Sequence, residues 1–169
     1  MPAPVTGTYP AYFEKYINLV DANSVAEAIE KYSSDIITFV ENIPTEKVDY
    51  RYAEGKWSIK EMLQHMTDTE RIFAYRALRI ARHDTTPLPG FDENKYAAAS
   101  NASARSWQSL LKEFEAVRKS TDLLLESFTS DHLNQTGTTN DQPNTSLAIS
   151  YMVFGHLLHH INILKERYL

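Results

Sequence analysis

Residues 147–169 read LAISYMVFGHLLHHINILKERYL. Wound as a helix, this stretch is apolar almost all the way round until Ile163, and a helix with so little polar face belongs in the interior of a protein. Thr145 or Ser146 stands directly before it, and both residue types favour the N-cap position of a helix. The sequence therefore predicts a buried helix from about residue 146 to the last residue of the chain.

A second helix is predicted nearer the start of the chain. Ser24 and Glu27 form an S-x-x-E capping box, in which each side chain satisfies a free backbone N–H of the other residue. Apolar side chains then recur at helical spacing up to Val40. Pro44 lies beyond the last of them, where a helix cannot easily continue.

Two further helices follow the same logic. Ser58 and Glu61, in WSIKE, repeat the capping box and open a helix expected to run to about Arg82. Another helix is expected from about Ser103, because apolar residues again recur at helical spacing as far as Phe128. Four helices and no convincing strand alternation predict an all-α fold, a four-helix bundle forming one domain over residues 1–169.

Two polar connections separate the later helices. HDTTPLPGFDENKY, residues 83–96, contains strong helix breakers and belongs to a connection of roughly 20 residues, which is long for a bundle and indicates a functional or crossing segment. SDHLNQTGTTNDQPNTS, residues 130–146, is rich in turn formers and is predicted to be a mobile loop with His132 in solvent.

Composition excludes several classes of function. The chain has 169 residues and no cysteine, which rules out disulfides, thiolate metal sites and a cysteine nucleophile. Seventeen basic against 22 acidic residues give a net charge of −5, so nucleic-acid binding is not expected. No membrane span and no signal peptide are recognised, and a cytoplasmic location is expected.

Three histidines are the strongest candidates for chemistry. His156 and His160 lie four residues apart, so both project from one face of the last helix and can reach the same ion. His65, in the helix that Ser58 opens, is the candidate third ligand, since bundles build internal metal sites from side chains on neighbouring helices.

Other interpretations of these histidines stay open. Each could be a hydrogen-bonded core residue, and His159 could pair with His156 instead of His160. His83 is about 27 Å further along the helix of His65 and cannot share its ion. A zinc peptidase of the H-E-x-x-H type is not expected, because Leu157 occupies the position of the required glutamate.

Two blocks of this sequence closely resemble the DinB family of metal-binding helical proteins, also called YfiT-like. They are KWSIKEMLQHMTDTERIFAYRALRIARHDTTPLPGFDENKY, from Lys56 to Tyr96, and GHLLHHINILKERYL at residues 155–169. The resemblance extends over nearly the whole chain. It implies a four-helix bundle in a variant of up-and-down topology, a homodimer, and one ion held by His65, His156 and His160 with water.

The resemblance also implies the chemistry. Three neutral nitrogen ligands leave an open coordination position, as catalytic sites do, and such ligands suit a divalent ion such as zinc or nickel. We expect a metal-dependent transferase that activates a low-molecular-weight thiol against an electrophile. The alternatives are a metal-dependent hydrolase and a non-enzymatic stress protein that keeps the ion for stability.

Several neighbouring residues have less certain roles. Arg76 or Arg79 could hold an acidic part of the substrate, or could belong to a solvated or carboxylate-paired face. Asp68 is the better candidate for a carboxylate that orients a ligand, and Glu70 the weaker one. Three aromatic residues are candidates either for a homodimer interface or for the core: Phe73, Tyr75 and Phe91.

Overall fold

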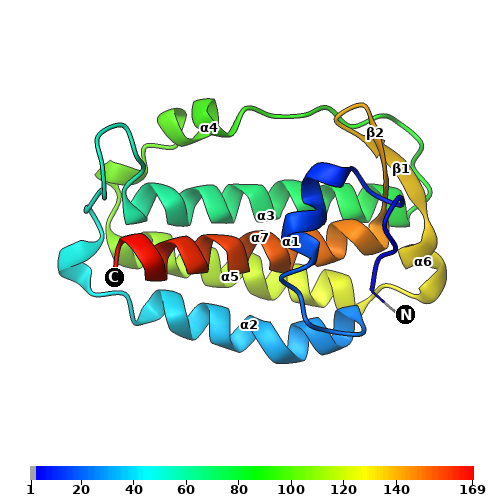
Figure 1. Ribbon diagram of the computed structural model, residues 1–169, viewed down its shortest axis with the longest axis horizontal. Coiled ribbons are helices and arrows are strands. Elements are labelled where there is room, and N and C mark those ends of the chain that lie inside the picture. Colours follow the sequence, from blue (N-terminus) through cyan, green and yellow to red (C-terminus); the bar gives the residue numbers. More distant parts are fainter. Residues whose placement is uncertain (1–2) are drawn as a thin grey trace.

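The structure is a computed structural model that describes residues 3–169. Four long helices form its body: α2 (Val25–Glu41), α3 (Ile59–Ala81), α5 (Trp107–Glu126) and α7 (Ser146–Arg167) (Figure 1). The shorter elements are α1 (Glu14–Ile17), α4 (Glu93–Ala99), α6 (Ser130–Asn134), β1 (Thr136–Thr139), β2 (Gln142–Thr145), and the 3-10 turns η1 (Ala11–Phe13), η2 (Thr45–Lys47) and η3 (Ala102–Ala104). The expected all-α four-helix bundle is confirmed.

The predicted helix starts are close to the observed ones. The Ser58–Glu61 capping box is formed in both directions, and Thr145 caps α7 by accepting a hydrogen bond from the Ala148 N–H. At α2 the box is only half formed, because the Glu27 carboxylate accepts from the N–H of Asn23 instead of Ser24. The start expected at Ser103 was early: η3 makes a separate turn there, and Ser106 is the N-cap of α5.

The helices are connected in an unusual order. Around the bundle, α3 packs on α5 and α7, and α2 packs on the same two helices, so α2 and α3 lie diagonally opposite each other. Figure 1 shows α3 and α5 running in one direction and α2 and α7 in the other. Because α3 and α5 are parallel, residues 82–106 must return along the whole bundle, and this connection carries α4. The predicted crossing segment is therefore present.

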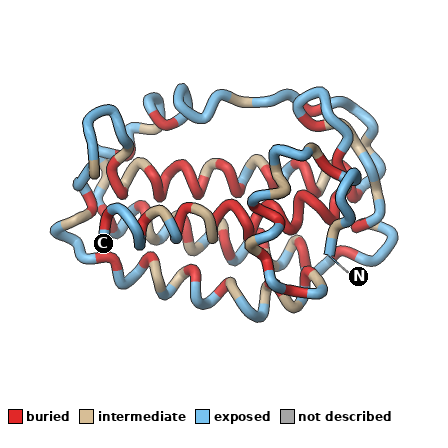
Figure 2. Tube along the Cα trace, in the orientation of Figure 1, coloured by how far each residue is buried: buried red, intermediate tan, exposed pale blue. Residues whose placement is uncertain are grey.

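Burial follows the apolar pattern of the sequence. Helix α7 is the most buried of the long helices, and its buried face runs from Ser146 to Leu164 with few interruptions (Figure 2). By length and composition alone α7 could cross a membrane, but 78% of its apolar window is buried against the rest of the bundle. Its hydrophobicity is thus accounted for by the core that it forms.

The polar segment at residues 130–146 is more ordered than the sequence predicted. It contains α6 and an antiparallel hairpin in which Thr136 pairs with Thr145 and Thr139 with Gln142. Asn140 and Asp141 form the two-residue turn with φ of 50° and 59°, the left-handed conformations that a type I′ hairpin requires. The expectation of an irregular loop without strands was wrong here, and the mobility of the segment stays a prediction.

Candidate metal centre

His65 from α3 meets His156 and His160 from α7 inside the bundle. The Nε2 atoms of the three rings are separated by 3.0 Å (His65 and His156), 3.1 Å (His65 and His160) and 3.0 Å (His156 and His160). All three side chains are buried, at 5–8% exposure. Across the part of the chain that the structure describes, these three form the only group of histidine and carboxylate side chains close enough to hold a metal ion. The sequence-predicted residues are thus brought together.

Hydrogen bonds among the three rings do not account for this arrangement. A ring nitrogen either carries a proton and donates, or has a lone pair and accepts. With three mutually close Nε2 atoms, at least two must have the same role, so at least one of the three contacts is unfavourable. A cation that accepts all three lone pairs removes this conflict.

The protonation state of the histidines fits the same interpretation. Burial lowers the pKa of His65 to about 4. Burial, together with the neighbouring histidines, lowers the pKa values of His156 and His160 well below their usual range. The three rings are therefore neutral near pH 7, which is the form of imidazole that binds metals.

The spacing matches a small divalent ion. Nitrogen ligands at about 2.0–2.1 Å from a tetrahedral ion lie about 3.3 Å from one another. The observed separations of 3.0–3.1 Å are within a few tenths of an ångström of that value. The residues present therefore fit a metal ion such as zinc, held by three neutral nitrogens.

The residues that support the ligands are not those expected from the sequence. Thr69, one turn after His65, places its hydroxyl 3.5 Å from His65 Nδ1, and the Trp57 ring packs on His65 at 4.7 Å between centroids. Asp68 instead accepts a hydrogen bond from Gln64 at 2.9 Å and lies 3.5 Å from Arg71. Asp68 therefore does not orient a ligand, because its carboxylate binds Gln64 and Arg71 instead.

Glu70 is also excluded from the metal centre. Its Oε1 accepts a hydrogen bond from Arg118 at 2.7 Å, and both side chains are almost completely buried in the bundle. Arg118 also pairs with Asp122 and donates to the Ser33 hydroxyl at 3.3 Å. This cluster joins α2, α3 and α5, so Glu70 has a structural role.

The remaining histidines lie outside the ligand set. The His159 ring packs edge-on against the Tyr16 ring, with 5.1 Å between the ring centroids, and lies 5.2 Å from the centroid of the His160 ring. It therefore does not pair with His156. His83 lies 3.4 Å from Asp131, away from the triad. His132 is partly exposed, but it lies in α6 and not in an irregular loop as predicted, and its Nδ1 accepts from the Thr129 N–H in the capping box of that helix.

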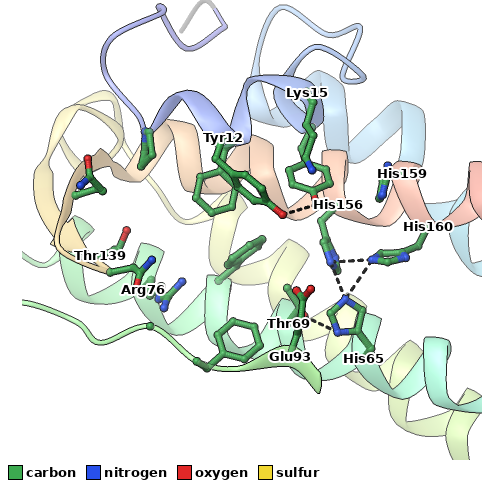
Figure 3. A pocket seen from close by; sticks show the side chains of 18 of the residues that line it. Tyr12, Lys15, His65, Thr69, Arg76, Glu93, Thr139, His156, His159 and His160 are labelled. Carbon is green, nitrogen blue, oxygen red and sulfur yellow. Dashed lines mark hydrogen bonds between the residues drawn. The ribbon is translucent and has the colours of Figure 1, made fainter. Parts of the chain in front are cut away.

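A cavity of about 490 Å³ opens onto the triad (Figure 3). Its walls come from α1, α3, α7, the start of α4 and the β1–β2 hairpin. Gly155 lets α1 form one wall, because a Cβ at this position would lie 2.2 Å from the backbone oxygen of Tyr16. The His65, His156 and His160 rings form one end of the cavity, so an ion there would face open space on its fourth side.

The cavity carries three charged side chains besides the triad. Arg76 lines it and is buried, and Lys15 and Glu93 line it from exposed positions on α1 and α4. Glu93 therefore places a carboxylate in the wall of the cavity onto which the three histidines open. Sequence reasoning missed Glu93. Its position in the long connection after the PLPGF breakers was the available signal, since long loops often carry functional residues.

The other residues singled out from the sequence have ordinary environments. Arg79 is paired with Asp84 and does not line the cavity, in line with the carboxylate-paired alternative. Phe73 is 5% exposed and packs on Phe13 in the cavity wall, so it belongs to the core. Tyr75 is 52% exposed, and Phe91 packs on the Tyr96 ring.

Comparison with known proteins agrees with this architecture. YfiT from Bacillus subtilis, described as a probable metal-dependent hydrolase with an unusual four-helix bundle topology, superposes with a TM-score of 0.72 at 16% identity, over 96% of this chain and 89% of that chain. A mycothiol-dependent maleylpyruvate isomerase superposes with a TM-score of 0.67 at 12% identity, over 89% of this chain and 59% of that chain. These two likenesses establish the fold.

Sequence comparison gives the family. A protein of Oceanobacillus iheyensis named as a candidate metal-dependent hydrolase is 28% identical over 82 residues, which cover 48% of this chain and 47% of that protein, so the match spans about half of the relative's length. A sequence profile described as the DinB superfamily matches residues 28–164, which include all three histidines of the triad. The chain therefore belongs to the DinB superfamily.

Proposed function

We propose that this protein is a metal-dependent enzyme that activates a low-molecular-weight thiol for transfer to a small electrophile. The observation that carries the proposal is the triad of neutral histidines at one end of an open cavity. The similarity to a mycothiol-dependent isomerase supports a thiol as co-substrate. The cytoplasm, where small thiols are kept reduced, is the compartment that suits this reaction.

The ligand set suits activation of a nucleophile. A divalent ion bound by three neutral nitrogens keeps its full charge, and at its open position it would lower the pKa of a thiol or a water molecule. The thiol must come from solution, because the chain contains no cysteine. The ligand chemistry favours zinc or nickel, and either ion would serve to activate the thiol.

The chain's own residues would bind and orient the reactants. His65, His156 and His160 would hold the ion, while the Thr69 hydroxyl lies beside His65 Nδ1 and limits rotation of that ring. Burial raises the pKa of Tyr16 far above the working range, with the neighbouring Tyr12 hydroxyl adding to the effect. The Tyr16 hydroxyl therefore stays protonated. It offers the cavity a hydrogen-bond donor and not a base.

The open cavity argues against a purely structural ion. Structural zinc sites are closed by four protein ligands, whereas catalytic sites keep one position for water or substrate. Here the described residues supply three ligands, and the space beside them is about 490 Å³, which is in the range of small-molecule sites. The stress-protein alternative, in which the ion only stabilises the fold, is therefore less well supported.

Hydrolysis is a second candidate, and Glu93 favours it. The absence of a carboxylate at Leu157 counted against a general base, but Glu93 places one in the wall of the cavity that the triad also lines. A carboxylate within reach of a water molecule at the ion can accept its proton. The names of the Bacillus and Oceanobacillus relatives also refer to metal-dependent hydrolysis.

Cobalt substitution separates the two reactions. We expect the cobalt(II) protein to develop an intense near-ultraviolet charge-transfer band when a small thiol binds at the ion, and the His156→Ala variant to show no such band. His159→Ala is the matched control, since His159 lines the same cavity but is not a ligand, and it should retain the band. If cobalt fills the site, no thiol produces the band, and esters or amides are turned over, hydrolysis replaces thiol transfer.

The Glu93 side chain gives a further distinction. Glu93→Gln should lower hydrolysis of an ester about 10²–10⁴-fold if the carboxylate is the general base. The same substitution should leave thiol binding at the cobalt ion unchanged, because coordination itself stabilises the deprotonated thiol. An equal loss of ester hydrolysis and of thiol binding would mean that Glu93 does not act as a general base but affects the site in another way.

A further inference from the structure

Arg76 is a buried cation for which the structure provides no counter-ion. Its side chain is 7% exposed, and its one hydrogen bond runs from Nη2 to the backbone oxygen of Pro89 at 2.6 Å. The guanidinium also lies 5.9 Å from the centre of the Phe91 ring. Across residues 3–169 it forms no ion pair. Burying an unpaired charge is costly, and burial lowers the pKa of Arg76 accordingly.

A second buried arginine shows how the same bundle accommodates such a group. Arg118 is fully buried, and it pairs with Glu70 at 2.7 Å and with Asp122. These ion pairs are what a structural role requires, because a buried charge is normally paired. The lack of a partner at Arg76 therefore points to a negatively charged group that arrives from outside the chain.

Polar groups of the hairpin line the cavity together with Arg76. They are Thr139, Asn140 and Gln142, at and beside the β1–β2 turn. The hairpin is fixed to the crossing segment, because the Leu88 N–H donates to the oxygen of Thr138 at 2.9 Å and the Asn140 N–H donates to the oxygen of Leu88 at 2.8 Å. These bonds hold the hairpin next to the segment that contains the acceptor of Arg76, Pro89.

A glycine lies where the two segments meet. A Cβ at Gly90 would lie 2.2 Å from the side-chain oxygen of Asn140. The exposed Asn140 side chain therefore lies against the crossing segment, in the cavity wall that it shares with Arg76.

Arg76 and the metal triad lie at opposite ends of the cavity. His65 and Arg76 are both on α3, eleven residues apart, which corresponds to about 16 Å along a helix axis. Figure 3 shows Arg76 and Thr139 together at one side and the three histidines at the other. The side chains of Phe13 and Phe73 line the cavity as well, so the space includes an apolar wall.

We propose that Arg76, with the side-chain amides of Asn140 and Gln142, binds the carboxylate of an elongated small molecule whose other end reacts at the ion. The inference rests on the proposed function and adds the substrate class. A carboxylate is favoured because a planar guanidinium matches it in geometry and a single positive charge matches it in charge. An apolar chain between the two ends would lie along the aromatic wall.

A neighbouring cavity of about 310 Å³ is also lined by Arg76, together with residues 88–91 of the crossing segment. Its lining is mostly apolar and aromatic, and the Arg71 that also lines it is already paired with Glu113. The hairpin donors line the larger cavity and not this one. The anion is therefore assigned to the cavity that contains the metal triad.

A series of thiols tests the proposal. Mercaptopropionate, mercaptohexanoate and mercaptoundecanoate would be titrated into the cobalt(II) protein, each beside the mercapto alcohol of equal length. We expect the acid to bind about tenfold or more tightly than its alcohol once the chain is long enough to reach Arg76, and no such preference for the shortest pair. Arg76→Met should abolish the preference and leave the affinity for the alcohols unchanged.

Two controls exclude a general electrostatic effect. Arg79→Met removes a cation from the same helix that is paired with Asp84 and lies outside the cavity lining, so the acid preference should persist. Arg76→Lys keeps the charge but not the planar fork, and should retain only part of the preference. Equal affinities of acids and alcohols at every length in the parent protein would overturn the proposal.

The proposal can also be separated from thiol transfer itself. If no thiol changes the cobalt spectrum, thiol activation is wrong, and calorimetry with undecanoate and undecanol then tests the carboxylate site alone. If undecanoate binds more tightly than undecanol, and Arg76→Met removes this preference, the carboxylate site is established without thiol chemistry. No preference for the acid in that measurement would overturn it.

Discussion

At the scale of single residues, the protein contains two kinds of buried polar group. The charge of Arg118 is paired with those of Glu70 and Asp122, whereas the three Nε2 atoms of the triad lie close together without a consistent set of hydrogen bonds. A core can hold a buried charge that is paired, but unsatisfied polar groups cost free energy unless a ligand compensates them. The triad is therefore the part of the core most dependent on a bound partner.

Removal of a single ligand should remove the ion. We expect the purified protein to retain about one equivalent of a divalent metal, and His65→Ala and His160→Ala each to lose most of it, because two imidazoles hold such an ion far more weakly than three. His159→Ala should retain it. Elemental analysis of the parent and the three variants makes the comparison, and equal metal in all four would refute the assigned ligands.

The two buried arginines should respond to substitution in opposite ways. Arg118→Met leaves Glu70 buried without its partner and should lower the free energy of unfolding by about 3–5 kcal/mol. Arg76→Met removes an unpaired buried charge and should leave stability equal or higher. Urea unfolding monitored by circular dichroism provides both values. A loss at Arg76 as large as that at Arg118 would show that Arg76 is structural.

At the scale of elements, sequence patterns predicted the long helices because their apolar spacing and N-caps are local signals. Helix α3 was expected from Ser58 to about Arg82 and runs from Ile59 to Ala81. The hairpin was missed because TGTTNDQPNT has no alternation of apolar and polar residues. Its one local signal was Asn140–Asp141, a pair that tolerates the left-handed turn conformations.

The metal ligands could be predicted from sequence, but the residues around them could not. The spacing of His156 and His160 places both on one face, and that depends only on helix geometry. Which carboxylate lines the cavity depends instead on tertiary contacts: Glu70 pairs with Arg118, while Glu93 enters the cavity wall from the start of α4. No local pattern contains that information.

The contact between α1 and α7 should be sensitive to one methyl group. Gly155→Ala places a Cβ 2.2 Å from the backbone oxygen of Tyr16, so α1 must shift. We expect a loss of about 1–3 kcal/mol from overpacking, which exceeds the gain of about 1 kcal/mol in helix propensity. Differential scanning calorimetry should show a lower Tm for Gly155→Ala.

A matched substitution provides the control for that experiment. Ser120→Ala alters a small residue on the exposed face of α5 and should leave the Tm unchanged or slightly higher. An unchanged Tm in Gly155→Ala as well would show that α1 accommodates the methyl group without cost.

At the scale of the whole molecule, the topology explains why the cavity exists. Parallel α3 and α5 require residues 82–106 to return along the bundle (Figure 1), and this return brings Gly90 and Glu93 into the wall of the cavity that α3 and α7 also line. An ordinary up-and-down bundle would connect these helices by a short turn. The crossing segment, together with α1 and the hairpin, encloses the space in front of the triad.

The oligomeric state stays a prediction. We propose a homodimer, and of the three aromatic residues considered for its interface Tyr75 is the most exposed, whereas Phe73 is held in the core. Light scattering at working concentration should give twice the mass of the 19.3 kDa chain. A mass of one chain would rule the dimer out, and a dimer that Tyr75→Glu leaves intact would exclude Tyr75 from its interface.

The central claim is that His65, His156 and His160 hold one ion whose open side faces the cavity. X-ray diffraction from crystals of the metal-loaded protein, with data collected on both sides of the metal's absorption edge, tests it directly. We expect one anomalous peak about 2.0–2.1 Å from all three Nε2 atoms, with no fourth protein ligand and with solvent density on the cavity side. An anomalous peak elsewhere, or an ion at the triad closed by a fourth side chain, would contradict it.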